Sequence, residues 1–453
     1  MYRIACTGMW RFAAPRAVGS IPALHARYTD PMPVCIIFDD GRGNLAPLTD
    51  LRSAGEIRTG ALTTAERLAA MSSALQAECA ALYMPDGVAA LARERLEPAI
   101  NSMEKVAKGE DDVLLLNARA VLLPEAALEL KRGETLVAHG GDVIAARTKR
   151  KEAEDFLAGK GNGRPAYEPP KGFKASEFAT PCLLENPWDV IRFRDDALDL
   201  DLQLLSQREC QALPEGVVAI NDEAVCISPE AMVYPTVVLD ASDGPIVIDD
   251  HAVVRPGAVI CGPAYIGEGS TVIDRALIKK HTSIGPVCKV AGEVGGCIFQ
   301  SFSNKAHDGH LGDSYVGEWV NLGAGTTNSN LLNTYTEVIA QIPGKTGAME
   351  RRRTGLQFLG AIIGDHVKTA ICTRIGTGAV IGTGAMIATT APAEGWIERF
   401  AWLTDKRARQ FRLEKFIETA RAMMARRHEE PSKALLARLK DIYPGGTEAA
   451  GTS

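Results

Sequence analysis

The chain has 453 residues, of which 46% are hydrophobic and 23% charged, and its net charge is −6. This length exceeds one ordinary hydrophobic core, so we expect two or three domains. The net negative charge does not favour a nucleic-acid or membrane-surface partner. No apolar run approaches the roughly 20 residues that span a bilayer. The 43 glycines beside only 6% aromatic residues predict many tight turns.

The ten cysteines form no C-x-x-C pair, and most of them lie among aliphatic residues, as Cys35, Cys261 and Cys372 do. We therefore expect reduced, buried thiols and a cytoplasmic protein. Residues 1–32 are rich in Arg and Ala, and we expect a poorly ordered extension there. Either a targeting segment or a start codon placed too far upstream would explain it, because Met32 stands just before the first predicted strand.

Residues 33–192 are predicted to form an α/β domain. Two buried strands, Val34–Phe38 and Val113–Leu116, each run into a polar loop. The helix-like stretches between them are Thr64–Glu78 and Val88–Leu96. Alternating strands and helices favour a parallel sheet, whose ligands bind at the carboxyl ends of the strands. The loops Asp39–Leu45 and Asn117–Arg119 lie at such ends, although each could equally be a plain turn.

Less regular segments flank the second half of the chain. Residues 155–180 are rich in Gly, Pro and Lys and are predicted to be a loop or a flexible insert. A linker helix is predicted within residues 193–214. The tail, residues 395–453, is helical in character, with a basic side that we interpret as a solvated helix face. The arginines of that side are Arg407, Arg409, Arg412 and Arg421.

A six-residue period dominates residues 215–394. Aliphatic residues recur at Ile248, Val254, Ile260, Ile266, Val272, Ile278 and Ile284. Small or modest residues follow four places later, at Ala252, Ala258, Ala264, Ser270, Ala276, Thr282 and Cys288. This register predicts a triangular coil with three six-residue sides, in which the aliphatic residues point inward. Neighbouring coils bury each other's apolar faces, so the segment is predicted to be a parallel β-helix.

The period fails between Val290 and Val316, where the loop Ser303–Asp313 interrupts it. Regular coils present few polar groups, so function tends to concentrate where a loop breaks the array. Two histidines, a lysine and an aspartate lie within the six residues Lys305–His310, which is unusual for a connecting loop. The sequence therefore places the candidate site at this interruption.

The same residues resemble a known enzyme. Lys305-Ala-His307 and then Leu311–Thr326 are similar to the acetyltransferase half of the bifunctional bacterial enzyme that makes UDP-N-acetylglucosamine. Across the whole chain, a divergent GlmU-like group of sugar nucleotidyltransferases is more similar still. Its motifs are matched by Phe38-Asp-Asp40, Leu45–Thr49, Ser303–Gly309 and Thr354–Gly360. The resemblance implies a nucleotidyltransferase-like α/β domain, a left-handed β-helix of the hexapeptide-repeat acyltransferase type, and a helical tail.

The resemblance also implies an activity, which is acetyl transfer from acetyl-CoA to an amino-sugar 1-phosphate with His307 as the catalytic histidine. The candidate substrate-binding residues are Lys289, Lys305, His310, Asn321 and Asn330. The candidate acetyl-CoA-binding residues are Gly323, Ala324 and Lys368. Acyltransferases of this fold form three-fold assemblies, so a homotrimer is expected. Two features depart from the family. Ala291 stands at the position of an arginine in its phosphate site, and the stretch between Val290 and Lys305 is shorter.

The chemistry supports this role for His307 without the resemblance. Acetylating a sugar amine requires a base that removes a proton from the nitrogen, and an imidazole titrates near neutrality. Backbone amides of a glycine-rich turn can stabilise the developing oxyanion. The ordinary alternative for His307 is a solvated loop histidine, and His310 could merely orient the substrate.

The first domain resembles nucleotidyltransferases, which cradle a triphosphate with a glycine-rich loop and hold Mg²⁺ with an aspartate at a later strand end. Here an asparagine stands at the place of that aspartate, and a neutral amide binds Mg²⁺ more weakly than a carboxylate does. The domain therefore binds a nucleotide sugar, uses a shifted metal site through Asp39 or Asp40, or is inactive. The candidate nucleotide-binding residues are Asp39, Arg42, Arg52, Asn117 and Arg119.

Two other functions remain open. The β-helix could be a non-catalytic oligomerisation platform for a nucleotidyltransferase. The chain could also resemble γ-carbonic anhydrases, with His307 and His310 as two metal ligands and His281 or His366 as the third, although the spacing matches poorly.

Overall fold

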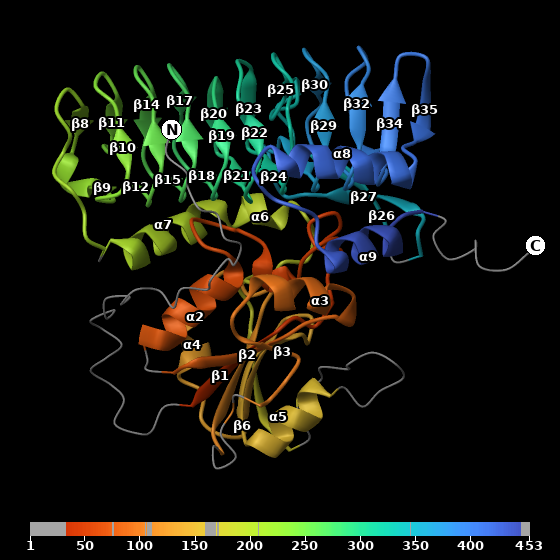
Figure 1. The fold of residues 1–453 in the computed structure, drawn as a ribbon. Coiled ribbons are helices and arrows are strands. Elements are labelled where there is room, and N and C mark those ends of the chain that lie inside the picture. Colours follow the sequence, from red (N-terminus) through yellow and green to blue (C-terminus); the bar gives the residue numbers. More distant parts are fainter. Residues whose placement is uncertain are drawn as a thin grey trace, which may run out of the picture.

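The computed structural model describes residues 33–444 except for 75–76, 105, 107–110, 159–168, 170–171, 207 and 345. It comprises an α/β domain, a long β-helix and two C-terminal helices (Figure 1). The expected extension, residues 1–32, lies outside the described residues. None of the helices in the described part of the chain is long and apolar enough to cross a membrane.

The α/β domain is built on one seven-stranded sheet with the order β3-β2-β1-β4-β6-β5-β7. Its strands are β1 (Val34–Phe38), β2 (Cys79–Tyr83), β3 (Ala99–Ile100), β4 (Val113–Asn117), β5 (Glu134–Ala138), β6 (Val143–Thr148) and β7 (Lys174–Phe178). β1 pairs in parallel with β2 and β4, which confirms the two predicted strands and brings their carboxyl ends together. β7 lies inside the segment predicted to be a loop.

Short helices cover this sheet and lead out of it. They are η1 (Ala54–Glu56), α2 (Thr64–Ala74), α3 (Asp86–Arg95), α4 (Glu125–Leu128), α5 (Arg150–Leu157), α6 (Asp189–Arg192) and α7 (Arg194–Leu205). The helices predicted between the two buried strands are α2 and α3. The first ends four residues before its predicted end, and the second ends one residue before it. The predicted linker helix is α7, which lies along the β-helix (Figure 1).

The β-helix has three sheets that run along its length, and their strands are parallel throughout the coils. The first sheet contains β10 (Met232–Val233), β13 (Val253–Val254), β16 (Thr271–Val272), β19 (Lys289–Val290), β22 (Asn304–Lys305), β29 (Lys368–Thr369), β32 (Met386–Ala388) and β34 (Ala401–Thr404). The second contains β8 (Val218–Ile220), β11 (Val238–Asp240), β14 (Val259–Cys261), β17 (Leu277–Ile278), β20 (Glu293–Gly295) and β23 (His310–Gly312), followed by the pair β25 (Thr327–Asn328) and β30 (Arg374–Ile375). The third contains β9 (Val225–Ile227), β12 (Ile246–Ile248), β15 (Ala264–Ile266), β18 (Thr282–Ile284), β21 (Ile298–Phe299), β24 (Tyr315–Val316), β28 (Ala361–Ile363), β31 (Ala379–Ile381) and β33 (Trp396–Ile397).

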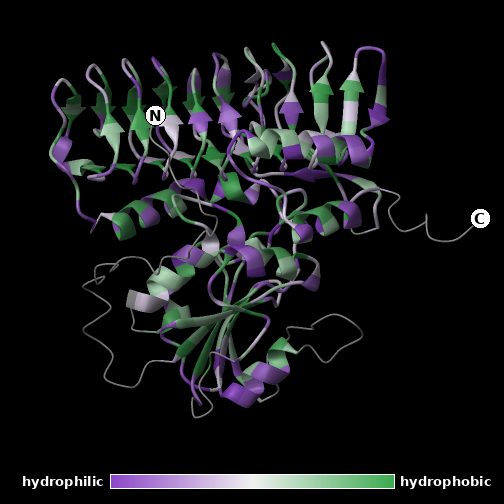
Figure 2. Ribbon diagram, in the orientation of Figure 1, coloured by the Kyte–Doolittle hydropathy of each residue, from purple (hydrophilic) through white to green (hydrophobic). Residues whose placement is uncertain are grey.

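The predicted period is the core of this β-helix. All seven aliphatic residues from Ile248 to Ile284 are at most 1% exposed, and the small residues that follow them are buried as well. Figure 2 shows green, hydrophobic segments in many of the coils, interspersed with purple ones, and the apolar inner faces of neighbouring coils stack on one another. The period-six interpretation is therefore confirmed, and η2 (Asp222–Ala224) is a short turn in the first coil.

The outer side of the third sheet is apolar too, and other parts of the chain cover it. Ile298, Tyr315, Ile362 and Val380 pack against residues of the α/β domain such as Trp188. Farther along the same sheet, Val247 and Tyr265 pack against α7. Two faces of these strands are thus buried, and the two domains share a core.

The tail differs from its prediction. Residues 396–410 were predicted to be helical, but they form β33, β34 and β35 (Arg407–Gln410) and extend the β-helix. Trp402 packs on Phe411, so pairing with the last coil outweighs the helical composition. The helices α8 (Leu413–Ala425) and α9 (Lys433–Asp441) follow. An inserted hairpin of β26 (Ile339–Pro343) and β27 (Met349–Arg353) also leaves the coils.

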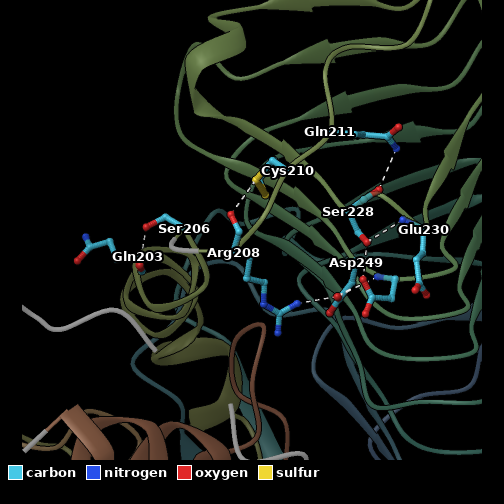
Figure 3. The surroundings of a disulfide bond; sticks show 10 residues. Gln203, Ser206, Arg208, Cys210, Gln211, Ser228, Glu230 and Asp249 are labelled. Atoms are coloured by element: carbon cyan, nitrogen blue, oxygen red, sulfur yellow. Dashed lines mark hydrogen bonds and ion pairs between the residues drawn. A yellow bond between two sulfur atoms is a disulfide. The ribbon is translucent and has the colours of Figure 1, made fainter. Parts of the chain in front are cut away.

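The cysteine prediction is wrong for one pair. Cys210 and Cys226 form a disulfide bond, with their Cα atoms 5.2 Å apart (Figure 3). The bond ties the segment after α7 to the first coil, and nearby Arg208 donates a hydrogen bond of 2.6 Å to Asp249. The two cysteines lie 16 positions apart in the sequence, and only the coil geometry brings them together. Free thiols remain at other positions, for example the buried Cys35 and the exposed Cys372.

Candidate active site

His307 lies in the short loop between β22 and β23, at a corner of the β-helix. The buried ammonium group of Lys305 holds this loop from beneath, because its Nζ donates to the carbonyl oxygens of Ala291 and His307, each at 2.9 Å. The N–H of Gly325 donates to the carbonyl of Asp308 at 3.1 Å. Neighbouring coils thus fix the loop, while the side chain of His307 remains exposed.

Two cavities meet at His307. One lies between the first sheet and α8 and has a volume of about 670 Å³, and we call it the α8 cavity. The other follows the corner turns of successive coils and has a volume of about 1090 Å³, and we call it the corner groove. Of the described residues, Ala306 and His307 line both. An imidazole in this position can reach a ligand from either side.

The α8 cavity gathers several of the residues predicted from the sequence. Lys289, Asn321, Gly323 and Lys368 line it together with His307. Asn321 bridges β22 and β29 through parallel backbone pairing, so the first sheet continues beneath the cavity. Lys289 and Lys368 come from coils on either side of the interruption, which explains why the sequence alone could not show how close they lie.

Lys368, which lines the α8 cavity, has a lowered pKa. Burial lowers the pKa of its ammonium group to about 8. Its Nζ donates to the carbonyl oxygen of His366 at 3.1 Å, and the structure shows no carboxylate beside it in the described part of the chain. A partly desolvated ammonium without a counter-ion is suited to binding an anion.

The corner groove contains Ala324. The N–H of the preceding Gly323 donates to Thr369 Oγ1 at 2.9 Å, and the carbonyl of Ala324 accepts from the N–H of Cys372 at 2.7 Å. Among the described residues, none accepts a hydrogen bond from the N–H of Ala324. This N–H can therefore donate to a ligand oxygen, as an oxyanion-binding amide must.

Three predicted substrate-binding residues line neither cavity. Lys305 is 2% exposed, and its ammonium group donates hydrogen bonds to two backbone carbonyl oxygens. His310 faces Glu293, with 3.4 Å between His310 Nδ1 and the carboxylate. Asn330 donates to Asp313 Oδ2 at 2.7 Å, beside Gly312. The side chains of these three residues thus do not line the two cavities that meet at His307.

The histidines proposed as metal ligands do not converge. His281 lies 3.3 Å from Asp195, and His366 is buried with both ring nitrogens unbonded. In the described part of the chain, no group of three or more His, Cys, Asp or Glu side chains is arranged to hold a metal ion. The geometry gives the carbonic-anhydrase alternative no support.

The strand ends of the first domain form a closed ion network. Arg119 is fully buried and donates from Nε and Nη2 to the two carboxylate oxygens of Asp40, each at 2.8 Å. Asn117 donates to the same carboxylate at 2.9 Å. Arg119 also contacts Asp142, which pairs with Arg42 as well. The residues predicted here do meet, but they bind one another.

This network bears on Mg²⁺ binding. Asp39 accepts hydrogen bonds from the N–H groups of Ala54 at 2.7 Å and Gly41 at 2.9 Å, and burial raises its pKa to about 6. The carboxylate of Asp40 already faces a guanidinium group. Mg²⁺ prefers charged oxygen ligands in an open octahedral arrangement. The residues present therefore do not fit a Mg²⁺ site in this arrangement.

Arg52 lies elsewhere, at the contact between the domains. It is 1% exposed, and its Nη2 lies 3.0 Å from Asp365 and 3.1 Å from Glu318 of the β-helix. Arg52 takes no part in the strand-end network, because both of its charged partners belong to the β-helix.

Sequence reasoning missed the contribution of α8. Arg426 and Arg427, which follow the helix, line the α8 cavity beside Lys289. Phe302 and Trp319 form another part of the wall, with their rings stacked at a centroid distance of 4.4 Å. The two aromatic residues stand seventeen places apart at equivalent corners, a spacing visible in the sequence, whereas the position of α8 was not.

Comparison with known proteins agrees with both halves of this description. Residues 35–209 match the sugar nucleotidyl transferase family. A bifunctional sugar-1-phosphate nucleotidylyltransferase/acetyltransferase from Sulfurisphaera tokodaii is 35% identical over 140 residues, covering 30% of this chain and 34% of that protein. A bifunctional protein GlmU from an Exiguobacterium species is 27% identical over 204 residues, covering 40% and 41%.

Among solved structures, a hexapeptide transferase family protein from Anaplasma phagocytophilum aligns with 48% of this chain and 92% of its own, at 12% identity and a TM-score of 0.17. The chain spans 34% and 41% of the two curated relatives. It is thus similar to the bifunctional nucleotidylyltransferase/acetyltransferases, and its residues 35–209 match the family of sugar nucleotidyl transferases.

Proposed function

We propose that the chain transfers the acetyl group of acetyl-CoA to the amino group of an amino-sugar 1-phosphate. The observation that carries this proposal is the position of His307, which is exposed in the walls of both the α8 cavity and the corner groove. A transferase must bring two ligands to one base, and a residue shared by two cavities meets that need. The transferase activities named for the relatives support the same reaction class.

The reaction follows from the groups around the shared residue. The sugar nitrogen attacks the thioester carbonyl and forms a C–N bond, while His307 accepts the proton that the nitrogen loses. The N–H of Ala324 donates to the carbonyl oxygen as negative charge develops on it. The C–S bond then breaks, and the thiolate of coenzyme A leaves and takes up a proton.

The remaining predicted residues differ in how directly they are proposed to act on the ligands. Asn321, Gly323, Lys368 and Lys289 share a cavity with His307 and are placed to contact ligands directly. Lys305 acts as a positioning residue through the backbone of the His307 loop. His310 and Asn330 lie outside both cavities, so their proposed contact with substrate would require a second subunit to complete the site. We therefore retain the homotrimer, in the cytoplasm where acetyl-CoA is available, as part of the proposal.

The test is replacement of His307 by Ala. We expect kcat for acetyl-CoA and glucosamine 1-phosphate to fall by about 100-fold or more, because a positioned general base contributes at least that much. Release of the coenzyme A thiol measures the rate. His139→Ala is the matched control, since His139 is an exposed histidine of the other domain. Equal turnover by His307→Ala and wild type would remove His307 from the mechanism.

The match of residues 35–209 suggests nucleotidyl transfer to a sugar 1-phosphate by the first domain, but the ion network at its strand ends argues against this activity. We assign no step to Mg²⁺, because the carboxylate oxygens of Asp39 and Asp40 already accept hydrogen bonds from Ala54 and Arg119. We expect no pyrophosphate release from UTP and N-acetylglucosamine 1-phosphate in the presence of Mg²⁺. Pyrophosphate release at a rate comparable with acetyl transfer would establish the second activity and show that the network opens.

A further inference from the structure

Four cationic side chains converge on the α8 cavity. Lys289 and Lys368 come from β19 and β29, while Arg426 and Arg427 follow α8, and no Asp or Glu lines the same cavity. In the described part of the chain, none of the four forms an ion pair with a carboxylate. The cavity therefore has a net positive lining.

Several buried arginines elsewhere in the molecule are paired with acids, whereas these four cations are not paired with any acid among the described residues. Four buried arginines each lie between 2.6 and 3.0 Å from a carboxylate oxygen. They are Arg52, Arg67, Arg119 and Arg194. Desolvation of a cation without such a partner is costly. Among the four cavity cations, this cost applies most to Lys368, which is partly buried and whose desolvation no carboxylate of the described residues compensates, whereas Lys289 and Arg426 are exposed. Burial and the neighbouring charges of Arg427 and Arg426 lower the pKa of Lys289, so the members of the group repel one another.

The group is held in place by packing and by hydrogen bonds. Phe416, Ala420 and Met424 bury one side of α8. Arg427 donates to the carbonyl of Val287 at 3.1 Å and to Asn304 Oδ1 at 2.7 Å. Favourable interaction with the C-terminal end of the helix dipole is an ordinary reason for arginines after α8, but it does not account for two lysines from separate coils.

We infer that the α8 cavity binds the clustered phosphates of a nucleotide, with Lys289, Arg426 and Arg427 as its anion-binding groups. A volume of about 670 Å³ lies in the range of small-molecule sites and exceeds the space that one phosphate group fills. The stacked Phe302 and Trp319 give the same cavity an apolar wall, which suits a ligand that carries a ring system as well as phosphates. Both coenzyme A and a nucleoside diphosphate sugar have this chemistry.

This inference deepens the proposed function but does not require it, because binding is measured without turnover. The full-length protein is titrated by calorimetry with coenzyme A, UDP-N-acetylglucosamine, glucosamine 1-phosphate and inorganic phosphate. We expect at least one of the two nucleotides to bind more tightly than the two monophosphates. Tighter coenzyme A binding identifies the acyl donor as the occupant, and tighter UDP-sugar binding identifies the nucleotide sugar. Equal affinity for all four probes overturns the inference.

The variants Arg426→Gln and Arg421→Gln form a matched pair, because both residues are exposed arginines of the same region and only Arg426 lines the cavity. We expect Arg426→Gln to weaken nucleotide binding about 10-fold, as loss of one charge-assisted contact does, and Arg421→Gln to leave it within about 2-fold. An unchanged melting temperature shows that both variants fold. Equal affinities in the two variants contradict the inference.

The two proposals fail separately. If His307→Ala retains turnover while Arg426→Gln loses nucleotide affinity, acetyl transfer by His307 is wrong and the phosphate site stands. If His307→Ala abolishes turnover while Arg426→Gln keeps wild-type affinity, the phosphate site is wrong and the role of His307 stands.

Discussion

At the scale of single residues, the site depends on side chains whose burial is not evident from the sequence. Lys305 matches a family motif and was expected to contact substrate, yet it supports the His307 backbone from inside the coil. Burial lowers the pKa of Lys305 to about 8, as it does for Lys368. A motif identifies which residues matter, whereas burial decides whether each one touches a ligand or holds another residue.

The buried side chain of His366 leads to a quantitative prediction for the pH dependence of the free energy of unfolding. Burial and the charge of Lys368 lower its pKa to about 3. Between about pH 3 and pH 6.5 the unfolded chain therefore binds more protons than the folded chain, and the free energy of unfolding decreases as the pH falls through this window. The contribution of His366 has a slope of at most about 1.4 kcal/mol per pH unit.

We expect His366→Asn to reduce this slope, since asparagine tolerates the left-handed backbone at this position, where φ is 59°. Urea denaturation at several pH values measures it. His428→Asn is the control, because His428 lies outside the core and has a φ of 61°. A slope identical to that of the wild-type protein in the His366 variant would show that another group dominates the acid response.

At the scale of elements, the repeat was predictable and the exceptions to it were not. An inward aliphatic residue every six positions requires only that successive coils stack, so the seven positions from Ile248 to Ile284 could be assigned from their spacing. The tail offers no such period. Its first part joins the β-helix because Trp402 and Phe411 pack on the last coil, and only α8 and α9 are helical. Cys210 and Cys226 likewise pair through tertiary proximity.

The position of α8 is the element-scale feature with the greatest consequence. Its buried stripe of Phe416, Ala420 and Met424 is recognisable as helical spacing, but the surface that receives this stripe is formed by distant coils. Once α8 is seated, Arg426 and Arg427 come beside Lys289. The inferred phosphate site therefore depends on the docking of one helix.

At the scale of the whole molecule, the α/β domain and the β-helix form one continuous body. Trp188 and Tyr315 share a core, and Ser283 donates to the carbonyl of Gly60 at 2.7 Å. Arg52 provides the charged part of the contact with Asp365 and Glu318. Burial alone would raise the pKa of Glu318, but the charge of Arg52 outweighs it and lowers the pKa to about 2.

We expect Arg52→Met to lower the free energy of unfolding by about 3–5 kcal/mol, because it leaves buried carboxylates without their partner. Adding Glu318→Gln and Asp365→Asn should recover part of this loss, since the unpaired charges are then removed. Urea denaturation of the single and triple variants measures both effects. A change below about 0.5 kcal/mol in Arg52→Met would mean that the ion group contributes nothing to the domain contact.

By itself the sequence determined the β-helix, the two buried strands of the first domain and the importance of the loop around His307. Each of these follows from local spacing or from a contiguous motif. The tertiary structure decided that α8 covers the cavity, that Arg52 joins the domains, and that Asp40, Asn117 and Arg119 bind one another. Those contacts join residues dozens to hundreds of positions apart, and their geometry arises only when the coils, the sheet and the tail are packed together.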